Sequence, residues 1–321
     1  MPTWYSPTRC RASTASDCRP ARRRGTVSSF LRLPTTKVRD DAGVLVVGGG
    51  YLGSAIARLV GPSVTVVRRD ATPRPTRPLP AGARLVGLDL STGEPEDVRR
   101  AFAHLAAERP VVATLARPQG SDARFYPIAA RRLAEALPDH TTRLVWISST
   151  SACPDVDGPV DEHTTGPVGP RGRMQRAAEE AVRTICSHRG IPWVIVRLGG
   201  LYGPSRPIGG WWTRRGPGAV VPGHGWIATN LVHLADAARI VLAAAREPRA
   251  EGRTLLAVAP DHTPRRLAYA RAACARGEPP PRFEAPIPTD RRVRGKRVDG
   301  SHTATLLKYR FLHPVHAYGL R

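Results

Sequence analysis

The chain has 321 residues and a formal net charge of +23, and this length is enough for one large α/β domain or two smaller ones. No run of about 18 apolar residues occurs, so no membrane span is predicted. The five cysteines are scattered, odd in number and without metal-ligand spacing. They favour a reducing, cytoplasmic compartment over a disulfide framework, and no metal site is predicted.

The high charge raises the question of a nucleic-acid partner. Only three of the 49 basic residues are lysines, namely Lys37, Lys296 and Lys308. The arginines are spread along the whole chain, which is typical of a biased base composition and not of one basic face. Aromatic residues are few and no zinc-finger spacing occurs. We therefore predict that the chain has no nucleic-acid partner. The expected partner is a small-molecule substrate, and a homodimer is left open.

The first forty residues differ from the rest. They are rich in Arg, Ser, Thr and Pro, contain only Asp17 and Asp40 as acids, and show no sustained apolar period. This composition predicts a disordered basic tail over residues 1–40. An organelle transit peptide has the same composition and is the alternative interpretation.

From residue 43 onward, short Val/Ile/Leu runs alternate with segments of helical period. Near-continuous apolar strands separated by helices predict an α/β fold with a doubly wound parallel Rossmann sheet over residues 41–199. Residues 200–321 are predicted to form a small α+β subdomain on the substrate side, interleaved with the Rossmann core. The expected strands are 44–47, 64–67, 84–88, 111–115, 144–148, 193–198 and 254–258, and the expected helices are 51–60, 95–107, 123–137, 174–189, 234–246 and 265–276. Residues 199–225, rich in Gly, Pro and Trp, are expected to be irregular and to cover a cleft, and the last forty residues to form short strands and loops.

A glycine-rich turn joins the first expected strand to the first expected helix. Gly48 suits the tight turn, Gly50 permits close approach to a pyrophosphate, and Gly53 permits close contact between helix and strand. The helix then begins at Tyr51 and Leu52, where free N–H groups face an anion. This order predicts a dinucleotide-binding loop.

The end of the second strand predicts which dinucleotide binds. Arg68 and Arg69 follow it, and no acid occurs before Asp70. An acid near this point would accept hydrogen bonds from a ribose 2′-hydroxyl, whereas guanidinium groups suit a 2′-phosphate. The expected coenzyme is therefore NADP, with NAD less favoured. Asp89 either contacts the adenine or caps its own loop, and Leu115 and Ala116 are expected to pass along the bound coenzyme.

Further residues resemble a known family. Residues 148–155 (SSTSACPD), 159–162 (PVDE), 172–179 (GRMQRAAE), 197–204 (RLGGLYGP) and 230–236 (NLVHLAD) are similar to successive motifs of extended and atypical short-chain dehydrogenases/reductases of the NAD-dependent epimerase/dehydratase type. The resemblance runs from residue 43 to the end of the chain. It implies that Ser149, Arg197 and Asn230 contribute to substrate binding.

The chain departs from that family at its acid/base pair. Most members carry Tyr-x-x-x-Lys on the helix after the fifth strand, and alignment on Glu179 places Arg171 and Gln175 at these positions. Neither side chain can shuttle a proton. Ser149, Cys153 and Tyr202 are the candidate catalytic residues that remain. Cys153 is alternatively a buried hydrophobe, Tyr202 a structural turn residue and Ser149 a hydroxyl that satisfies loop backbone.

Two histidines have ordinary structural explanations. His163 is expected to be solvated in a loop, and His233 to cap a helix or lie in the core. Two functions stay open for the whole chain. The first is an NAD(P)-dependent oxidoreductase or epimerase that acts on a small polar carbonyl or hydroxyl compound. The second is a catalytically silent NADP-binding sensor or partner protein on the same fold.

Overall fold

The computed structural model describes residues 43–318 except 121, 123 and 216–218. The tail predicted over residues 1–40 therefore lies outside the described residues. The chain divides into two units at residue 37, and the second unit, from Val38 onward, contains the whole described fold. Of the described helices, none is long and apolar enough to cross a membrane.

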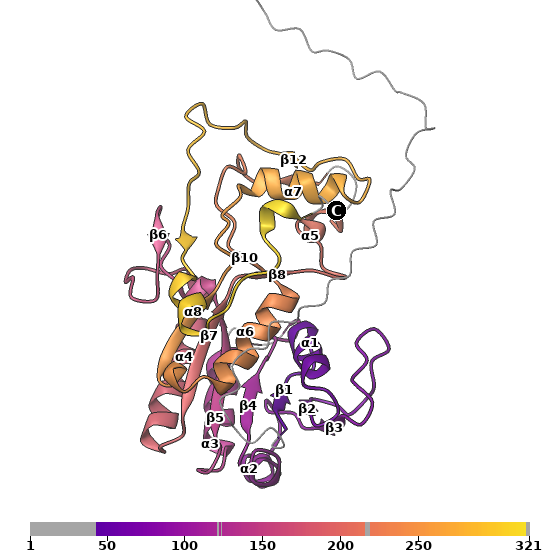
Figure 1. Cartoon of the computed structure of the whole chain (residues 1–321), viewed down its shortest axis with the longest axis vertical. Coiled ribbons are helices and arrows are strands. Elements are labelled where there is room, and N and C mark those ends of the chain that lie inside the picture. The colour runs from indigo at the N-terminus through magenta and orange to yellow at the C-terminus, as the bar shows by residue number, and fades with distance from the viewer. Residues whose placement is uncertain (1–42, 121, 123, 216–218, 319–321) are drawn as a thin grey trace, which may run out of the picture. The chain divides into compact units, whose positions relative to one another are not determined.

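A parallel seven-stranded sheet forms the centre of the fold, with strand order β11-β7-β5-β4-β1-β2-β3 (Figure 1). This order and the helices that connect the strands confirm the predicted doubly wound α/β sheet. Both faces of the sheet are buried, because alternate residues of one strand enter different core clusters. Val44 and Val46 lie in one cluster, and Leu45 and Val47 in the other. The strands are β1 (Leu45–Val47), β2 (Thr65–Arg68), β3 (Arg84–Gly87), β4 (Pro110–Ala113), β5 (Arg143–Ser149), β7 (Trp193–Leu198) and β11 (Arg253–Ala257).

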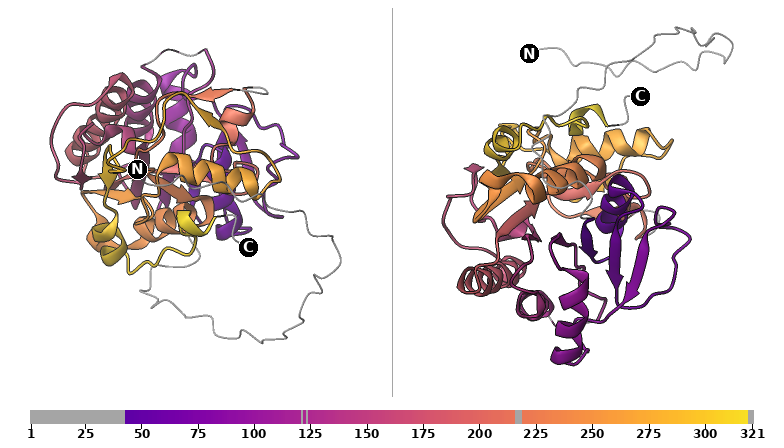
Figure 2. Two further views of the ribbon diagram at one scale, coloured as in Figure 1. Left: turned by 90° about the horizontal axis from the view of Figure 1, so that it is seen from above. Right: turned by 60° about the horizontal axis from the view of Figure 1, so that its bottom comes forward.

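Helices cover the sheet on its two sides. Helices α1 (Tyr51–Val60) and α6 (Leu234–Arg246) pack on one face through Ile56, Ile240 and their neighbours. On the other face lie α2 (Pro95–Leu105), α3 (Phe125–Ala136) and α4 (Pro170–His188), and α3 and α4 run side by side (Figure 2). These three layers bury a long apolar core on each side of the strands, which is the main stabilising contribution of the fold.

Helix α4 begins a full turn before the expected start at residue 174. Pro170 is its first residue, where a missing N–H costs no hydrogen bond. The amide of Gly169 donates to the Asp155 carboxylate at 3.0 Å, which fixes the entry into the helix. At Gly172 a Cβ atom would lie 2.2 Å from the Ser151 carbonyl oxygen, so the start of α4 rests directly against the turn that follows β5.

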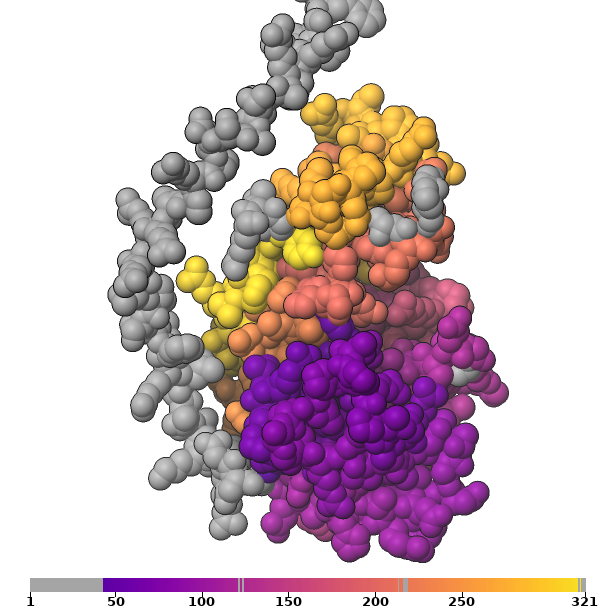
Figure 3. All heavy atoms as spheres, turned by 90° about the vertical axis from the view of Figure 1, so that its right-hand side faces the viewer, coloured from indigo at the N-terminus to yellow at the C-terminus, as the bar shows by residue number. Residues whose placement is uncertain are grey.

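Part of the C-terminal region, including α7 (Arg265–Cys274) and β12 (Arg282–Phe283), lies beyond the large sheet, and its orange atoms are stacked above the indigo N-terminal part in Figure 3. Strand β11 belongs to the large sheet, so the C-terminal region and the Rossmann core share one sheet. The boundary predicted at residues 199/200 stays a prediction. Small parallel pairs complete this region, namely β6 (Pro159–Val160) with β13 (Arg297–Val298), β8 (Gly200–Tyr202) with β10 (Leu231–His233) and β9 (Val220–Val221) with β12 (Arg282–Phe283).

Short helices also occur where the sequence indicated none. The last forty residues contain α8 (Ser301–Leu306) and the 3-10 turn Val315–Ala317, so the expectation of strands and loops alone was wrong there. The amide of Leu256 in β11 donates a hydrogen bond to the hydroxyl oxygen of Thr303 in α8 at 2.8 Å, which holds this helix against the sheet. The remaining helical elements are α5 (Gly210–Thr213), α7 (Arg265–Cys274) and the 3-10 turns Thr150–Ala152 and Pro248–Ala250.

Candidate functional site

The glycine loop has the conformation that close approach to a ligand requires. Gly48 has φ +108°, a region that favours glycine, and a Cβ on Gly53 would lie 1.8 Å from the Gly48 carbonyl oxygen. A Cβ on Gly50 would meet nothing within 4 Å, so the backbone there borders open space. Helix α1 begins at Tyr51 with no side-chain cap and no acid in its first turn. Its first N–H groups are therefore available to a phosphate, and the loop fits a dinucleotide.

Two adjoining cavities open at this loop. One has a volume of about 890 Å³ and extends from Gly50 to the ends of β5 and β7, and the other has about 170 Å³ and lies over the ends of β1 and β2. They share Gly50, Arg77 and residues 114–116. Leu115 and Ala116 therefore lie where both cavities meet, as expected for backbone that passes along a bound dinucleotide.

Arg68 lies beside the smaller cavity and is only 5% exposed. Its side chain covers the glycine loop, since a Cβ on Gly49 would lie 2.1 Å from the Arg68 Nε. The guanidinium Nη1 donates to the Thr72 carbonyl oxygen at 3.4 Å, but Nε and Nη2 are buried without a hydrogen-bond partner. Burial, and after it the nearby charge of Arg74, lowers the pKa of Arg68. An anion placed here would satisfy these donors.

The other polar residues predicted for this region line the same cavity. Arg69 is exposed on its wall, and Asp89 accepts hydrogen bonds from the amide and the hydroxyl of Ser91 at 2.8 and 2.5 Å. Burial alone would raise the pKa of Asp89, but these bonds offset it and the pKa is lowered. The geometry thus shows the loop-capping interaction, and the adenine contact stays a prediction.

Ser149 lies on the wall of the larger cavity, and its hydroxyl oxygen has one hydrogen bond to the backbone. This oxygen accepts a hydrogen bond from the Ser151 amide at 3.2 Å and so caps the turn after β5. Arg171 and Gln175, one turn apart on α4, line the same cavity. Neither side chain can act as a general acid or base at neutral pH.

Tyr202 also lines the larger cavity, but its hydroxyl is already in use. It is 2% exposed and donates to the His313 carbonyl oxygen at 2.6 Å. Burial, followed by the charges of Asp236 and Asp261, raises the pKa of Tyr202 strongly. This geometry matches the structural interpretation of that tyrosine.

Cys153 and Arg197 are not among the residues that line the larger cavity. Cys153 is fully buried with Val160, Leu256 and Val298, and burial raises the pKa of its thiol. Arg197 donates through Nε and Nη2 to the two carboxylate oxygens of Glu179 at 2.9 and 2.7 Å, in a buried bidentate pair.

Asn230 is likewise absent from the cavity lining and contacts backbone instead. Its amide nitrogen donates to the Lys296 carbonyl oxygen at 2.9 Å, and its amide oxygen accepts from the Val298 amide at 2.8 Å. It therefore holds β13 and the residue before it. Lys296 itself lines the larger cavity, as do Arg206, Arg214 and Trp211. Arg206, Trp211 and Arg214 belong to the segment 199–225 that was expected to cover a cleft, although none of them was singled out. Lys296 carried no sequence signal, because no motif surrounds it.

The expectations for the two histidines are confirmed. His163 is exposed, and His233 caps α6 by accepting from the Ala235 amide at 3.2 Å. His233, Asp236 and His313 have ligand atoms within 4.8 Å of one another, as a metal site would. However, the two rings stack with centroids 3.9 Å apart and an interplanar angle of 21°, so their in-plane lone pairs do not converge on one point. Asp236 already accepts four hydrogen bonds, from Tyr309, Leu312 and twice from His313.

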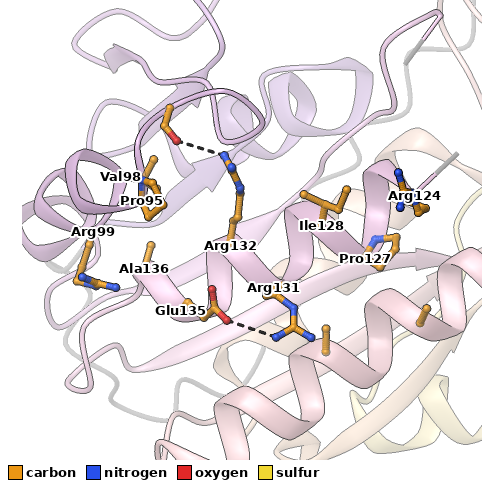
Figure 4. A pocket seen from close by; sticks show the side chains of 13 residues that line it. Pro95, Val98, Arg99, Arg124, Pro127, Ile128, Arg131, Arg132, Glu135 and Ala136 are labelled. Atoms are coloured by element: carbon orange, nitrogen blue, oxygen red, sulfur yellow. Dashed lines mark hydrogen bonds and ion pairs between the residues drawn. The ribbon is translucent and has the colours of Figure 1, made fainter. Parts of the chain in front are cut away.

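A third cavity, of about 520 Å³, lies between α2, α3 and α4 (Figure 4). It contains none of the predicted site residues. Its guanidinium groups have local partners, since Arg132 donates to the carbonyl oxygens of Leu90 and Gly93 and Arg131 pairs with Glu135 at 3.6 Å. We therefore assign no role to this cavity.

The fold and the glycine loop together define a Rossmann-type dinucleotide-binding protein. The model of the NAD-dependent epimerase/dehydratase family matches residues 44–258, and the chain belongs to this family. This confirms the family that the motifs of the sequence resemble. No curated protein matches the sequence at a significant level.

Solved structures similar to this chain share its fold at low sequence identity. UDP-glucuronic acid 4-epimerase from Bacillus cereus in complex with NAD has a TM-score of 0.68 at 18% identity, covering 85% of this chain and 93% of that one. UDP-glucose 4-epimerase from Thermotoga maritima with UDP-glucose has 0.69 at 19%, covering 85% and 94%. An epimerase from Methanothermobacter thermautotrophicus has 0.71 at 16%, covering 87% and 90%.

Proposed function

We propose that this protein is an NADP(H)-dependent oxidoreductase or epimerase that acts on a small polar carbonyl or hydroxyl compound. The proposal of NADP over NAD rests on the buried guanidinium of Arg68 at the end of β2, because two of its nitrogens lack a hydrogen-bond partner. A 2′-phosphate would satisfy both donors in bidentate geometry. Arg69, Arg74 and Arg77 line the same cavity and add positive charge.

Several residues would hold the coenzyme. The first turn of α1 and the open backbone at Gly50 would bind the pyrophosphate, and Leu115 and Ala116 would pass beside it. The bound coenzyme supplies hydride chemistry, and the protein supplies orientation and electrostatics. Ser149 is the residue proposed to hydrogen-bond the reacting oxygen. Of the other two predicted catalytic residues, Cys153 has a buried thiol and Tyr202 donates its hydroxyl to backbone, whereas the Ser149 hydroxyl only accepts a hydrogen bond from backbone.

The proton for a carbonyl reduction would come from water in the larger cavity. Reduction adds a hydride to the carbonyl carbon and a proton to its oxygen, so the proton must have a donor. Arg171 and Gln175 cannot provide it, and the proton of the Tyr202 hydroxyl is donated to backbone. The cavity opens to solvent, so water can reach the reacting oxygen.

The second function is a catalytically silent NADP-binding protein. Arg171 and Gln175 at the wall of the cavity favour it, because the residues of α4 that line the cavity then include no general acid or base. Consumption of NADPH, followed at 340 nm with a panel of aldehydes, ketones and keto acids, discriminates the two functions. Turnover supports an enzyme, whereas tight coenzyme binding with no turnover across the panel supports the silent protein.

The coenzyme proposal is tested by isothermal titration calorimetry, which measures the dissociation constants of NADP⁺ and NAD⁺. We expect Arg68→Ala to weaken NADP⁺ binding at least tenfold and NAD⁺ binding by less than threefold, because only NADP⁺ carries the 2′-phosphate. Arg69→Ala should have a smaller effect of the same kind. Arg84→Ala, an exposed arginine on β3 outside the cavity lining, is the matched control. Equal losses for both coenzymes would contradict the assignment.

A further inference from the structure

The wall of the larger cavity has an unbalanced charge. Arg77, Arg171, Arg206, Arg214 and Lys296 line it, and among the described lining residues there is no Asp or Glu. Lys296 is paired with Asp155, which lies outside the lining, so the excess of positive charge comes from the four arginines. Arg77 also borders the smaller cavity, and Arg206 lies 5.3 Å from the centre of the Tyr51 ring. Arg171 and Lys296 are on a different wall, beside the end of β5, two strands along the sheet from the glycine loop.

Lys296 is held in place from both ends. Its carbonyl oxygen is bound by Asn230, and its ammonium donates to the Cys153 carbonyl oxygen at 3.0 Å and to the Asp155 carboxylate at 2.8 Å. The side chain is 19% exposed. An ammonium has three donors, so one N–H remains after these two bonds. A lysine fixed in this way has already lost the rotamer freedom that binding would otherwise cost.

Asp155 connects the segment of Lys296 to the start of α4, and Arg171 and Lys296 line the same cavity. One Asp155 oxygen accepts from Lys296 and the other from the amide of Gly169, the residue before α4. Arg171 is the second residue of α4, is exposed, and makes no ion pair within the part of the chain that the structure describes. The first turn of α4 contains no acid of its own, and the only carboxylate described at its start is that of Asp155 on the Gly169 amide, so the helix dipole adds positive potential there.

An unsatisfied hydroxyl borders the same wall. The Ser151 Oγ is buried and has no hydrogen-bond partner, although Ser151 lines the cavity. Buried hydroxyl groups in native proteins are nearly always paired, so this atom indicates a ligand or water that the chain itself does not supply. Ser149 and Ser151 are two residues apart on the turn after β5.

We propose that Lys296, Arg171 and Ser151 bind an oxyanion of the substrate, a carboxylate or a phosphate, next to Ser149. The identity of this ligand as the substrate rests on the proposed oxidoreductase function. The substrate class is then a small carbonyl or hydroxyl compound with an acidic group a few bonds from the reacting carbon. Arg171 thus has a binding role at the position where the family's acid/base tyrosine was expected.

The test is isothermal titration of the full chain with malonate and, separately, with methyl phosphate. Each titration is run in the presence and in the absence of saturating NADP⁺, so that the arginines around the smaller cavity are occupied in one arm. We expect wild-type protein to bind at least one probe in both arms, and the preferred probe distinguishes a carboxylate from a phosphate. Lys296→Met and Arg171→Gln should each weaken binding at least tenfold, and Lys296→Arg should retain part of it.

Lys308→Met is the matched control, because this exposed lysine loses the same charge outside the cavity lining. It should bind the probes as wild type does. Arg171 is exposed, so Arg171→Gln tests the site even if Lys296→Met fails to fold. No binding of either probe to wild type, or binding unchanged in both variants, would overturn the oxyanion site. Coenzyme titration of the same samples keeps the two proposals separate, since loss of NADP⁺ binding alone would contradict only the proposed function.

Discussion

At the scale of single residues, Gly50 and Gly53 of the same loop differ in what surrounds them. A Cβ atom on Gly53 would lie 1.8 Å from the carbonyl oxygen of Gly48, whereas a Cβ atom on Gly50 would have no neighbour within 4 Å. Gly53 is therefore required by the packing of α1 on β1. No neighbour in the structure excludes a side chain at Gly50, so the proposed ligand is the physical reason expected for glycine there.

A pair of variants checks this distinction. We expect Gly50→Asp to abolish NADP⁺ binding with less than 1 kcal/mol change in the free energy of unfolding, because a carboxylate would occupy the open space beside the first N–H groups of α1. Gly53→Ala should instead lower the free energy of unfolding by about 2 kcal/mol or more. Titration and urea denaturation measure the two effects. Unchanged affinity in Gly50→Asp would refute the loop assignment.

The buried pair Glu179–Arg197 is the second prediction at this scale. Glu179 is fully buried and also accepts a hydrogen bond from the Ser148 hydroxyl at 2.6 Å. We expect Glu179→Leu to cost about 3–5 kcal/mol in urea denaturation, since it leaves a buried guanidinium unpaired. The double variant Glu179→Leu/Arg197→Leu should lose less than the single one. A larger loss in the double variant would show that the pair itself, and not the unpaired charge, determines stability.

At the scale of elements, helix α6 begins at an interaction that depends on pH. His233 caps α6, and its ring stacks on His313 from the C-terminal segment. Burial, and after it the charge of His313, lowers the pKa of His233 to about 4. The folded pKa is thus below the value of about 6.5 expected for the unfolded chain. The unfolded chain binds the proton more tightly, so stability is complete above pH 6.5 and falls as the pH decreases toward 4.

We expect the free energy of unfolding to fall by about 1–2 kcal/mol from pH 7 to pH 5 because of His233. His233→Asn should remove this part of the pH dependence while it keeps an acceptor for the Ala235 amide. Urea denaturation at a series of pH values gives both slopes. Parallel curves for the variant and the wild type would assign the pH dependence to other groups.

At the scale of the whole molecule, the core clusters of the described residues begin at Val44. We therefore expect a chain that lacks residues 1–40 to keep the melting temperature within about 2 °C of the full chain and to bind NADP⁺ with the same affinity. Differential scanning calorimetry and titration of the two proteins make the comparison. A large decrease in melting temperature would show that these residues belong to the folded structure.

Much of the sheet and one end of the site could be predicted from local patterns. A buried parallel strand is a short apolar run, and the glycine turn is a contiguous motif, so β1, α1 and their junction are encoded within about 17 residues. The two successive arginines at the end of β2, Arg68 and Arg69, are likewise a pattern of neighbouring residues. The prediction for the start of α4 was less accurate, at residue 174 and not 170. The hydrogen bond from Gly169 to Asp155 that fixes this start joins residues 14 apart in the sequence.

The sequence by itself determined the doubly wound fold, the family and the dinucleotide loop, since period, glycine spacing and motif order are properties of neighbouring residues. Only the tertiary structure decided which polar groups face the cavity. It brought Lys296 into an ion pair with Asp155, which is 141 residues away in the sequence. It also paired the Arg197 guanidinium with the Glu179 carboxylate and directed the Tyr202 hydroxyl to the carbonyl oxygen of His313. Such contacts depend on how distant segments pack, and no short pattern records them.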